Sequence, residues 1–211
     1  MDTVIFLAKP CQTSHIAYSL LESLWEEHKI VCLYKHINKK RYKRYPEKYD
    51  LGISFLYPYL VPQEQVEQHI WFNFHCGDLP KHPGRNLGYR TVMDNSTSFG
   101  GTLHWMNEYF DKGRIVEVKE FIVNEDDTAK DIMQKSYEQL IYLFYKYIPQ
   151  IINGNFPSGK QNDSQYIKSP KIDDYIELTE YQQKRIRALY CPPFYPHIKI
   201  GNKNYKIIEE K

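Results

Sequence analysis

Short apolar segments of strand length alternate with helix-like segments along the first third of the chain, and this alternation constrains the fold most. We expect strands over Val4–Ala8, Ile30–Tyr34, Asp50–Leu56 and Ile70–His75. The intervening segments predict a helix from Thr13 or Ser14 to about Lys29, with Ile16, Leu20, Leu21 and Leu24 at helical spacing, and a short helix over Gln63–Gln68. Strands joined through helices form crossover connections, so the sequence predicts an α/β fold with a mostly parallel sheet flanked by helices.

The rest of the chain predicts two further strands, one long helix and a polar loop. We expect strands over Gly101–Met106 and Arg114–Phe121, then a helix that Thr128 caps, that runs over Ala129–Tyr147 and that Pro149 ends. The apolar side of this helix consists of Ile132, Met133, Leu140, Leu143 and Phe144. Residues 153–171 are rich in Gly, Ser, Asn, Gln and Lys and predict a loop, whereas Glu180–Leu189 predicts a short basic helix.

The last segment, 198–208, alternates apolar and polar residues around Gly201-Asn202, which predicts a β-hairpin. An isolated hairpin is only marginally stable in water, so this one must pack on its own domain or on a second subunit. We therefore divide the chain into a domain over 1–150 and a C-terminal extension over 151–211, which contains the loop, the short helix and the hairpin.

Charge and cysteine content narrow the classes of function. The net charge is +2 and the pI is about 8.2, a balance that by itself does not indicate a nucleic-acid-binding protein. The basic, tyrosine-rich stretch 39–49 is more readily explained as a solvated surface. The four scattered cysteines form no C-x-x-C pair and predict neither a zinc site nor a disulfide framework. Without signal-peptide features or an apolar run near the roughly 20 residues of a membrane span, a cytoplasmic protein is expected.

An amide, an imidazole and a distant carboxylate form the candidate site. Asn73 and His75 are two residues apart at the end of a predicted strand, so both side chains point to one face, where α/β sheets bind ligands. Asp111, on a separate segment, could fix the tautomer of the imidazole, and the amide could donate to an oxygen that becomes negative during acyl transfer. No serine or cysteine occupies an obvious activating position, so the attacking group belongs to a substrate. This order of residues favours formyl or acyl transfer to a bound amine.

Taken singly, each of these residues has an ordinary structural explanation, such as a turn for the aspartate. Together with their neighbours they resemble the formyltransferases that use N10-formyltetrahydrofolate. The motifs concerned are Asn73-Phe74-His75-Cys76-Gly77-Asp78-Leu79-Pro80, Pro83-Gly84-Arg85, Gly101-Thr102-Leu103-His104 and Asp111-Lys112-Gly113-Arg114-Ile115, within residues 50–120. The resemblance implies a Rossmann-like formyltransferase domain over 1–150 and catalytic roles for Asn73, His75 and Asp111. Cys76 points away from the face of His75, so we expect no shared proton between them.

The resemblance also implies sites for two substrates. Phe55, Leu56 and Tyr57 at a strand end, with Met106 and Asp111, are expected to bind the folate, because an apolar slot with free backbone groups suits a flat heterocycle. Core packing explains the first two of these nearly as well. The expected acceptor contacts are Lys9, Lys81, Arg85, Tyr89 and His104. The guanidinium of Arg85 suits a phosphate. Lys9 is either a pyrophosphate contact or an exposed loop residue, and His104 is either a substrate contact or a structural support.

Three branches of this family differ outside the shared motifs. Glycinamide ribonucleotide formyltransferases have a glycine-rich phosphate loop after the first strand, where this chain has Lys9-Pro10-Cys11-Gln12-Thr13-Ser14. Methionyl-tRNA formyltransferases carry a C-terminal β-barrel domain. We expect the residues that follow the long helix in this sequence to be too few for such a domain. The ending 185–194 before the hairpin resembles the short C-terminal segment of sugar-nucleotide N-formyltransferases, some of which dimerise through it.

We therefore expect formyl transfer from N10-formyltetrahydrofolate to the amine of a nucleotide-linked sugar, such as dTDP-4-amino-4,6-dideoxyglucose or its 3-amino isomer, for O-antigen or another surface glycan. The expected partners are the folate, the sugar nucleotide and a second copy of the chain, without metal, nucleic acid or membrane. Two alternatives stay open. One is formylation of glycinamide ribonucleotide or another small amine, and the other is a non-catalytic interaction module whose stretch 39–49 binds an acidic partner.

Overall fold

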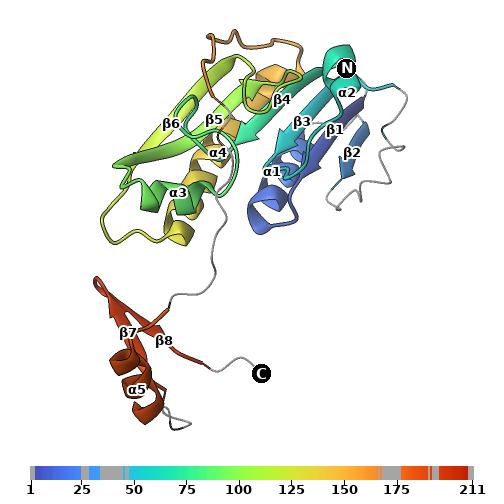
Figure 1. The fold of residues 1–211 in the computed structure, drawn as a ribbon. Helices are drawn as coiled ribbons and strands as arrows, with labels where there is room; N and C mark the ends of the chain where they lie inside the picture. The colour runs from blue at the N-terminus through green and yellow to red at the C-terminus, as the bar shows by residue number, and fades with distance from the viewer. Residues whose placement is uncertain are drawn as a thin grey trace. The chain divides into compact units, whose positions relative to one another are not determined.

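The computed structural model describes residues 3–24, 29–33, 45, 48–165, 167, 177–189, 191 and 195–208. The chain forms two compact units (Figure 1), one made of Met1–Val123 with Asp127–Ser169 and the other of Asn124–Asp126 with Pro170–Lys211. Residues 151–169, which the sequence places in the C-terminal extension, lie in the first unit. Most of the basic, tyrosine-rich stretch 39–49 lies outside the described residues.

The first unit is built on a six-stranded sheet of order β2-β1-β3-β4-β5-β6. Its strands are β1 (Thr3–Ala8), β2 (Lys29–Leu33), β3 (Leu51–Phe55), β4 (Ile70–His75), β5 (Ser98–Trp105) and β6 (Ile115–Ile122). The pairs among β1 to β4 are parallel, whereas β5 runs antiparallel to both of its neighbours. The predicted mostly parallel sheet is confirmed. The reversed strand β5 pairs with β4 as far as His75, the carboxyl end of β4. The candidate site lies at this end.

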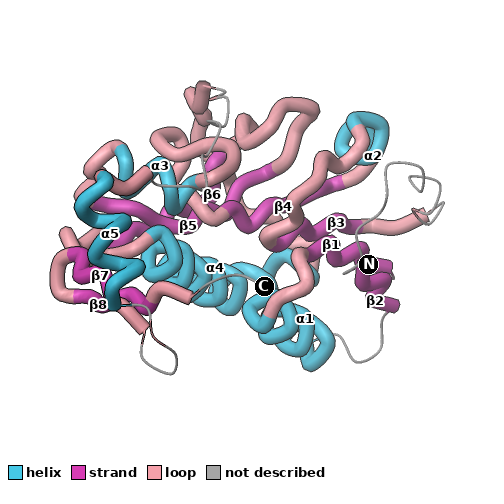
Figure 2. The backbone as a smooth tube through the Cα atoms, turned by 60° about the horizontal axis from the view of Figure 1, so that its bottom comes forward, coloured by secondary structure: helices cyan, strands magenta, loops and turns pink. Residues whose placement is uncertain are grey.

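Helices cover both faces of the sheet. α1 (Gln12–Leu24) and α4 (Ala129–Ile152) lie next to each other (Figure 2) and share one buried core with the β1 residues Val4 and Phe6. The alternate β1 residues Ile5 and Leu7 face a second core, against which α2 (Gln63–Gln68) packs through Val66. α3 (Leu87–Met93) contacts α4. Burial of β1 on both faces explains why its sequence is continuously apolar.

The long helix α4 begins where the sequence predicted but ends later. Thr128 and Asp131 form a capping box, with the Asp131 N–H donating to Thr128 Oγ1 and the Thr128 N–H donating to Asp131 Oδ2. The prediction that Pro149 ends the helix is wrong, because this residue lies inside it. Ile148 and Ile151 are fully buried. Burying two such side chains contributes roughly 3–6 kcal/mol, which offsets the about 3 kcal/mol that an interior proline costs.

The helix α1 buries only part of the predicted apolar side, because Leu21 is buried and Leu20 packs against the core but Ile16 and Leu24 do not. Its buried residues are Ser14, Ala17 and Leu21, whereas Ile16 and Leu24 are 50% and 41% exposed. Positions 14, 17 and 21 follow the i, i+3, i+7 spacing of one helical face, and small residues at two of these positions allow close packing. The predicted end near residue 29 is also wrong, because that residue begins β2.

The second unit contains α5 (Glu180–Leu189) and a hairpin of β7 (His197–Ile200) and β8 (Lys203–Lys206), as predicted. Gly201 in the turn has φ +56, a conformation that favours glycine. Asn202 Nδ2 donates to Asp126 Oδ2 at 2.9 Å. The Gly-Asn pair that indicated a turn therefore also ties the hairpin to the short segment 124–126.

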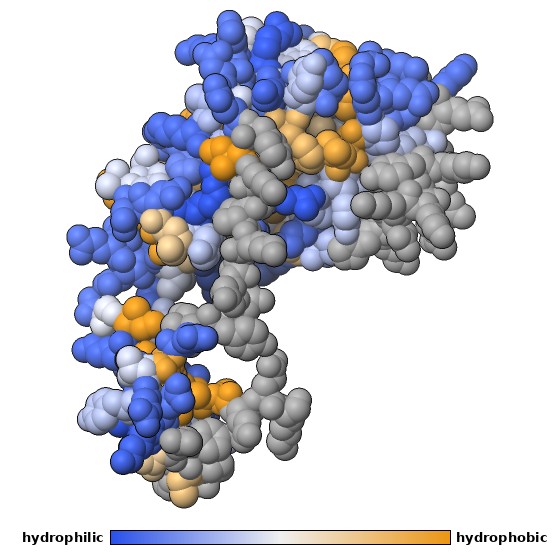
Figure 3. All heavy atoms as spheres, in the orientation of Figure 1, coloured by the Kyte–Doolittle hydropathy of each residue, from blue (hydrophilic) through white to orange (hydrophobic). Residues whose placement is uncertain are grey.

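Most of the residues that Figure 3 colours by hydropathy are hydrophilic on the face drawn. Large exposed hydrophobic side chains of the second unit include Tyr181, Leu189, Ile200 and Ile208. Among the helices described above, none is long and apolar enough to cross a membrane.

Candidate active site

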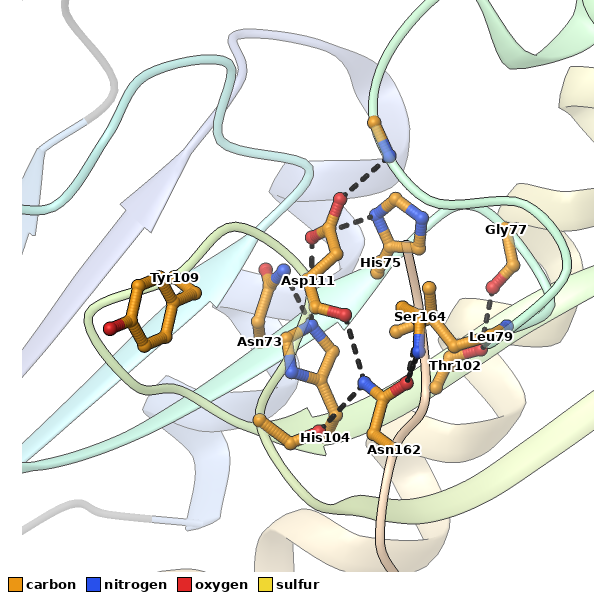
Figure 4. A network of polar contacts seen from close by, with 12 residues as sticks. Asn73, His75, Gly77, Leu79, Thr102, His104, Tyr109, Asp111, Asn162 and Ser164 are labelled. Atoms are coloured by element: carbon orange, nitrogen blue, oxygen red, sulfur yellow. Dashed lines mark hydrogen bonds and ion pairs between the residues drawn. The ribbon is translucent and has the colours of Figure 1, made fainter. Parts of the chain in front are cut away.

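Strand β4 carries an amide and an imidazole at one end of the sheet, where they lie close to Asp111 (Figure 4). His75 is buried, and its Nε2 lies 2.9 Å from the backbone carbonyl oxygen of His82. Because a carbonyl oxygen only accepts, Nε2 carries a proton and Nδ1 is the ring atom that faces the carboxylate. The distance from His75 Nδ1 to Asp111 Oδ1 is 3.5 Å. The structure thus brings the imidazole and the loop acid together.

The carboxylate of Asp111 is held from several sides. The residue lies on the loop between β5 and β6 with φ +51, a left-handed conformation that aspartate adopts more readily than most residues. Its Oδ2 accepts the backbone N–H of Gly84 at 2.8 Å, and its Oδ1 lies 3.8 Å from Nε2 of His104. The buried carboxylate therefore lies between two imidazoles, with one oxygen held by a backbone amide.

His104 supports the amide of Asn73 from the neighbouring strand. The two residues are opposite each other in the register of β4 and β5, and Asn73 Nδ2 lies 3.0 Å from His104 Nε2. His104 Nδ1 is 2.6 Å from the carbonyl oxygen of Trp105, so Nδ1 carries the proton and Nε2 accepts from the amide. Burial lowers the pKa of His104 to about 4, an effect that Asp111 opposes and His75 reinforces. This buried residue, predicted as a substrate contact or a support, has both ring nitrogens bonded within the protein.

The neutral state of His104 predicts a loss of stability in mild acid. An unfolded imidazole takes up a proton below pH 6.5, whereas folded His104 stays neutral down to about pH 4. The unfolded state binds more protons in this window, so the free energy of unfolding falls as the pH drops through it, by about 3 kcal/mol in full. Urea unfolding near pH 7.5 and near pH 5 should show a smaller fall for His104→Gln than for the unsubstituted protein. The exposed His197→Gln is the control, and equal falls in all three proteins would contradict the prediction.

The loop after β4 presents backbone groups to the site. Thr102 Oγ1 donates to the carbonyl of Gly77 at 2.5 Å and accepts the N–H of Leu79 at 3.0 Å. His82 Nδ1 and Asp78 Oδ1 are 2.6 Å apart, and both side chains are buried. These contacts hold the loop whose His82 carbonyl bonds the imidazole of His75 and whose Gly84 N–H bonds the carboxylate of Asp111. Sequence reasoning missed this buried pair, for which the Asp-x-x-x-His spacing was the available signal.

Two further residues shape the loop that carries the carboxylate. A Cβ on Gly113 would lie 1.6 Å from the carbonyl oxygen of Trp105, so only glycine fits. Asn162, from the segment after α4, donates its Nδ2 hydrogens to the carbonyls of Asp111 at 2.8 Å and Gly113 at 2.9 Å. Sequence reasoning missed this asparagine, because a polar residue in a polar segment gives no signal of its contacts.

The residues predicted to bind a folate differ in exposure. Phe55 is fully buried in the core shared with α4, so its side chain cannot contact a ligand. Leu56, Tyr57 and Met106 are half-buried, and the last two pack against one apolar cluster on the other face of the sheet. These three residues leave apolar surface at the edge of the sheet where the candidate site lies.

The predicted acceptor contacts are mostly exposed. Lys9 follows the carboxyl end of β1 and is exposed, and Tyr89 is half-buried on α3. Lys81 Nζ lies 2.8 Å from Glu120 Oε1, and Arg85 donates to a proline carbonyl. Both cations therefore have protein partners at the surface.

The site offers acyl-transfer chemistry without a protein nucleophile. Burial raises the pKa of Cys76 to about 12, so this thiol is protonated at neutral pH. Within the described part of the chain, no group of three or more His, Cys, Asp or Glu residues could hold a metal ion. An amide donor, an imidazole and a buried carboxylate suit attack by an amine that a substrate supplies.

Comparison with known proteins places the chain in a family. Residues 38–146, more than half of the 211-residue chain, match the family model for formyl transferases. Methionyl-tRNA formyltransferase of Wolbachia pipientis subsp. Culex pipiens is 25% identical over 168 residues, which cover 77% of this chain and 54% of that protein. GDP-perosamine N-formyltransferase of Brucella melitensis is 27% identical over 165 residues, 75% of this chain and 64% of that protein. The chain spans about half of the length of the first relative and less than two thirds of the second.

Solved structures share the whole fold. A sugar N-formyltransferase from a Shewanella species matches with a TM-score of 0.67 at 18% identity. The match covers 98% of this chain and 96% of the Shewanella chain. An N-formyltransferase from Helicobacter canadensis, solved with folinic acid and dTDP-3-aminofucose, has a TM-score of 0.66 at 21% identity, with 90% and 81% covered. The formyltransferase fold expected from the sequence is confirmed. Because the family match covers more than half of its residues, the chain belongs to the formyl transferase family.

Proposed function

We propose that this protein transfers the formyl group of N10-formyltetrahydrofolate to the amine of a nucleotide-linked amino sugar. The observation that carries the proposal is the meeting of Asn73, His75 and Asp111 at one edge of the sheet, in a member of the formyl transferase family. Similarity to the Brucella GDP-perosamine enzyme and to the Helicobacter enzyme solved with folinic acid and dTDP-3-aminofucose supports this donor and acceptor. Within the class we favour dTDP-4-amino-4,6-dideoxyglucose or its 3-amino isomer, used in the cytoplasm for a surface glycan such as O antigen.

The side chains of the site can serve this reaction. The donor supplies an activated formyl carbon, which forms a bond to the amine and loses its bond to N10, while one amine proton ends on N10. Asn73 Nδ2 carries two hydrogens, of which one points to His104, and the other can stabilise the oxygen that becomes negative. His75 Nδ1 and Asp111 Oδ1, 3.5 Å apart, can hold the proton that the amine releases.

The folate fits the edge of the sheet beside this group. Leu56 has φ +55, so the backbone turns out of the sheet directly after β3. Tyr57 and Met106 offer partly exposed apolar surface, which suits a flat ring system. We infer that these residues hold the pterin. Phe55 supports them only from the core.

A donor assay with several acceptors tests the proposed function. The purified chain is incubated with N10-formyltetrahydrofolate and, in turn, dTDP-4-amino-4,6-dideoxyglucose, its 3-amino isomer, GDP-perosamine, glycinamide ribonucleotide and methionyl-tRNA. We expect optical loss of the formyl donor to require one of the sugar nucleotides, with a kcat on the order of 1–10³ s⁻¹. The sugar product should gain the mass of a formyl group. Turnover only with glycinamide ribonucleotide or methionyl-tRNA would show that the acceptor is not a sugar nucleotide. Tight binding of a protein partner without any turnover would show that the protein is a non-catalytic interaction module.

We further infer that the second unit joins two copies of the chain. Tyr181, Leu189, Ile200 and Ile208 expose large apolar side chains within this small unit, and exposed apolar groups of this kind are typical of interfaces. We expect light scattering to give the mass of a dimer. Ile200→Lys should raise the dimer dissociation constant about tenfold or more, whereas Lys199→Gln should leave it unchanged. A monomer at every concentration would contradict the inference.

A further inference from the structure

The polar segment after α4 packs against the strands that flank the site. Lys160 and Ile115 exchange two backbone hydrogen bonds of 2.8 and 2.9 Å, and Trp105 Nε1 donates to the carbonyl of Pro157 at 3.1 Å. A Cβ on Gly159 would lie 2.7 Å from the Cβ of Arg114, so the backbone approaches the residue before β6 closely. A segment interpreted from sequence as a plain loop is therefore anchored next to the candidate site.

Asn162 lies at the inner side of this segment and uses its whole hydrogen-bonding capacity (Figure 4). Both hydrogens of its Nδ2 are donated, to the carbonyls of Asp111 and Gly113 at 2.8 and 2.9 Å. Its Oδ1 accepts the N–H and the hydroxyl of Ser164 at 3.0 and 2.5 Å. A primary amide offers two donors and two acceptor lone pairs, and here all four are satisfied. Reversing the amide would place its oxygen against two carbonyl oxygens, so this orientation is fixed.

These two hydrogen bonds act on a turn that needs external support. The left-handed φ of +51 at Asp111 is unfavourable for a residue with a Cβ, and such conformations persist when their surroundings enforce them. The carbonyls of Asp111 and Gly113 also converge on one point, where their oxygens repel each other unless a donor lies between them. The Asn162 amide is that donor, and it contacts only the main chain of the turn.

We propose that Asn162 is the positioning residue that holds the Asp111 carboxylate against His75. The inference rests on the proposed function for its meaning in catalysis, whereas its structural part stands alone. If the amide is lost, the turn relaxes and the separation of 3.5 Å between Asp111 Oδ1 and His75 Nδ1 increases. Misplacement of a reacting group by about 1 Å costs on the order of 10²-fold in rate. Loss of the residues that orient the ligands of metal sites has a comparable cost, about 10–100-fold.

Asn162→Asp is the sharpest test, because it keeps the shape of the side chain and replaces both N–H donors with an oxygen that repels the two carbonyls. We expect kcat to fall on the order of 10–100-fold with both KM values within about threefold. Asn162→Gln, which keeps the amide on a longer stem, should recover part of kcat. Asn155→Asp makes the same chemical change at an exposed position of the same segment and should behave as the unsubstituted chain.

A measurement without substrate separates this inference from the proposed function. With histidine labelled at Cε1, the NMR signal of His75 in Asn162→Asp should move toward its position in Asp111→Asn, while Asn155→Asp leaves it unchanged. If the labelled signal moves but no acceptor is formylated, the positioning role stands and the proposed function falls. If the His75 signal and kcat of Asn162→Asp match the unsubstituted protein, or if Asn162→Asp and Asn162→Gln both fail to fold while Asp111→Asn folds, Asn162 is a structural residue and the proposal is overturned.

Discussion

Asp111→Asn is expected to reduce kcat for formyl transfer on the order of 10²–10⁴-fold, the range that a positioned acid–base group contributes. Asparagine has the same shape as aspartate and its oxygen can still accept the N–H of Gly84, so the loop should keep its structure. What disappears is the negative charge 3.5 Å from His75 Nδ1, and with it the ability to hold a proton between the two side chains.

The Asp111→Asn measurement is steady-state kinetics with the sugar acceptor identified by the donor assay. Asp163→Asn changes an exposed carboxylate in the segment that also carries Asn162 and is the matched control. We expect the control to retain its kcat, and urea midpoints to agree within error for both variants. A kcat for Asp111→Asn within a factor of about three of the unsubstituted enzyme would remove this carboxylate from the mechanism.

His75→Gln is expected to cause a loss of similar size, on the order of 10²–10⁴-fold in kcat. The glutamine amide can still donate to the carbonyl of His82, so the loop after β4 keeps one of its contacts. The glutamine side chain has no basic nitrogen, so the amine proton has no acceptor beside Asp111. Far-ultraviolet circular dichroism and urea unfolding show whether the variant is folded, and the exposed His197→Gln is the control.

The double variant His75→Gln, Asp111→Asn distinguishes a shared role from two separate ones. Residues that act as one unit lose most of their contribution with the first substitution, so the double variant should be about as slow as either single variant. Losses that multiply would show that the imidazole and the carboxylate act independently. In that case the contact between them is structural.

Local patterns in the sequence were sufficient for most elements of the fold. The bounds of α2, β4 and α5 agree with the apolar periodicities and breakers read from the chain, and the Thr128 cap is formed as predicted. The spacing of Asn73 and His75 on one strand also indicated a shared face, because alternation along a strand depends only on backbone geometry. Short motifs in fixed order were enough to connect Asp111 with them.

The alternation of strands and helices, the capping of α4 and the residue types of the site all follow from the amino-acid sequence alone. Which atoms come into contact depends instead on how the whole chain packs. The carbonyl of His82 that bonds the imidazole carries no residue-type signal, and Asn162 meets the turn of Asp111 across 51 positions of sequence. Tertiary packing is also the reason that α4 continues beyond Pro149 to Ile152. In α1, the same kind of packing buries Ala17 and leaves Ile16 exposed. Such contacts depend on the closing of distant segments around one core, and no local pattern encodes that closure.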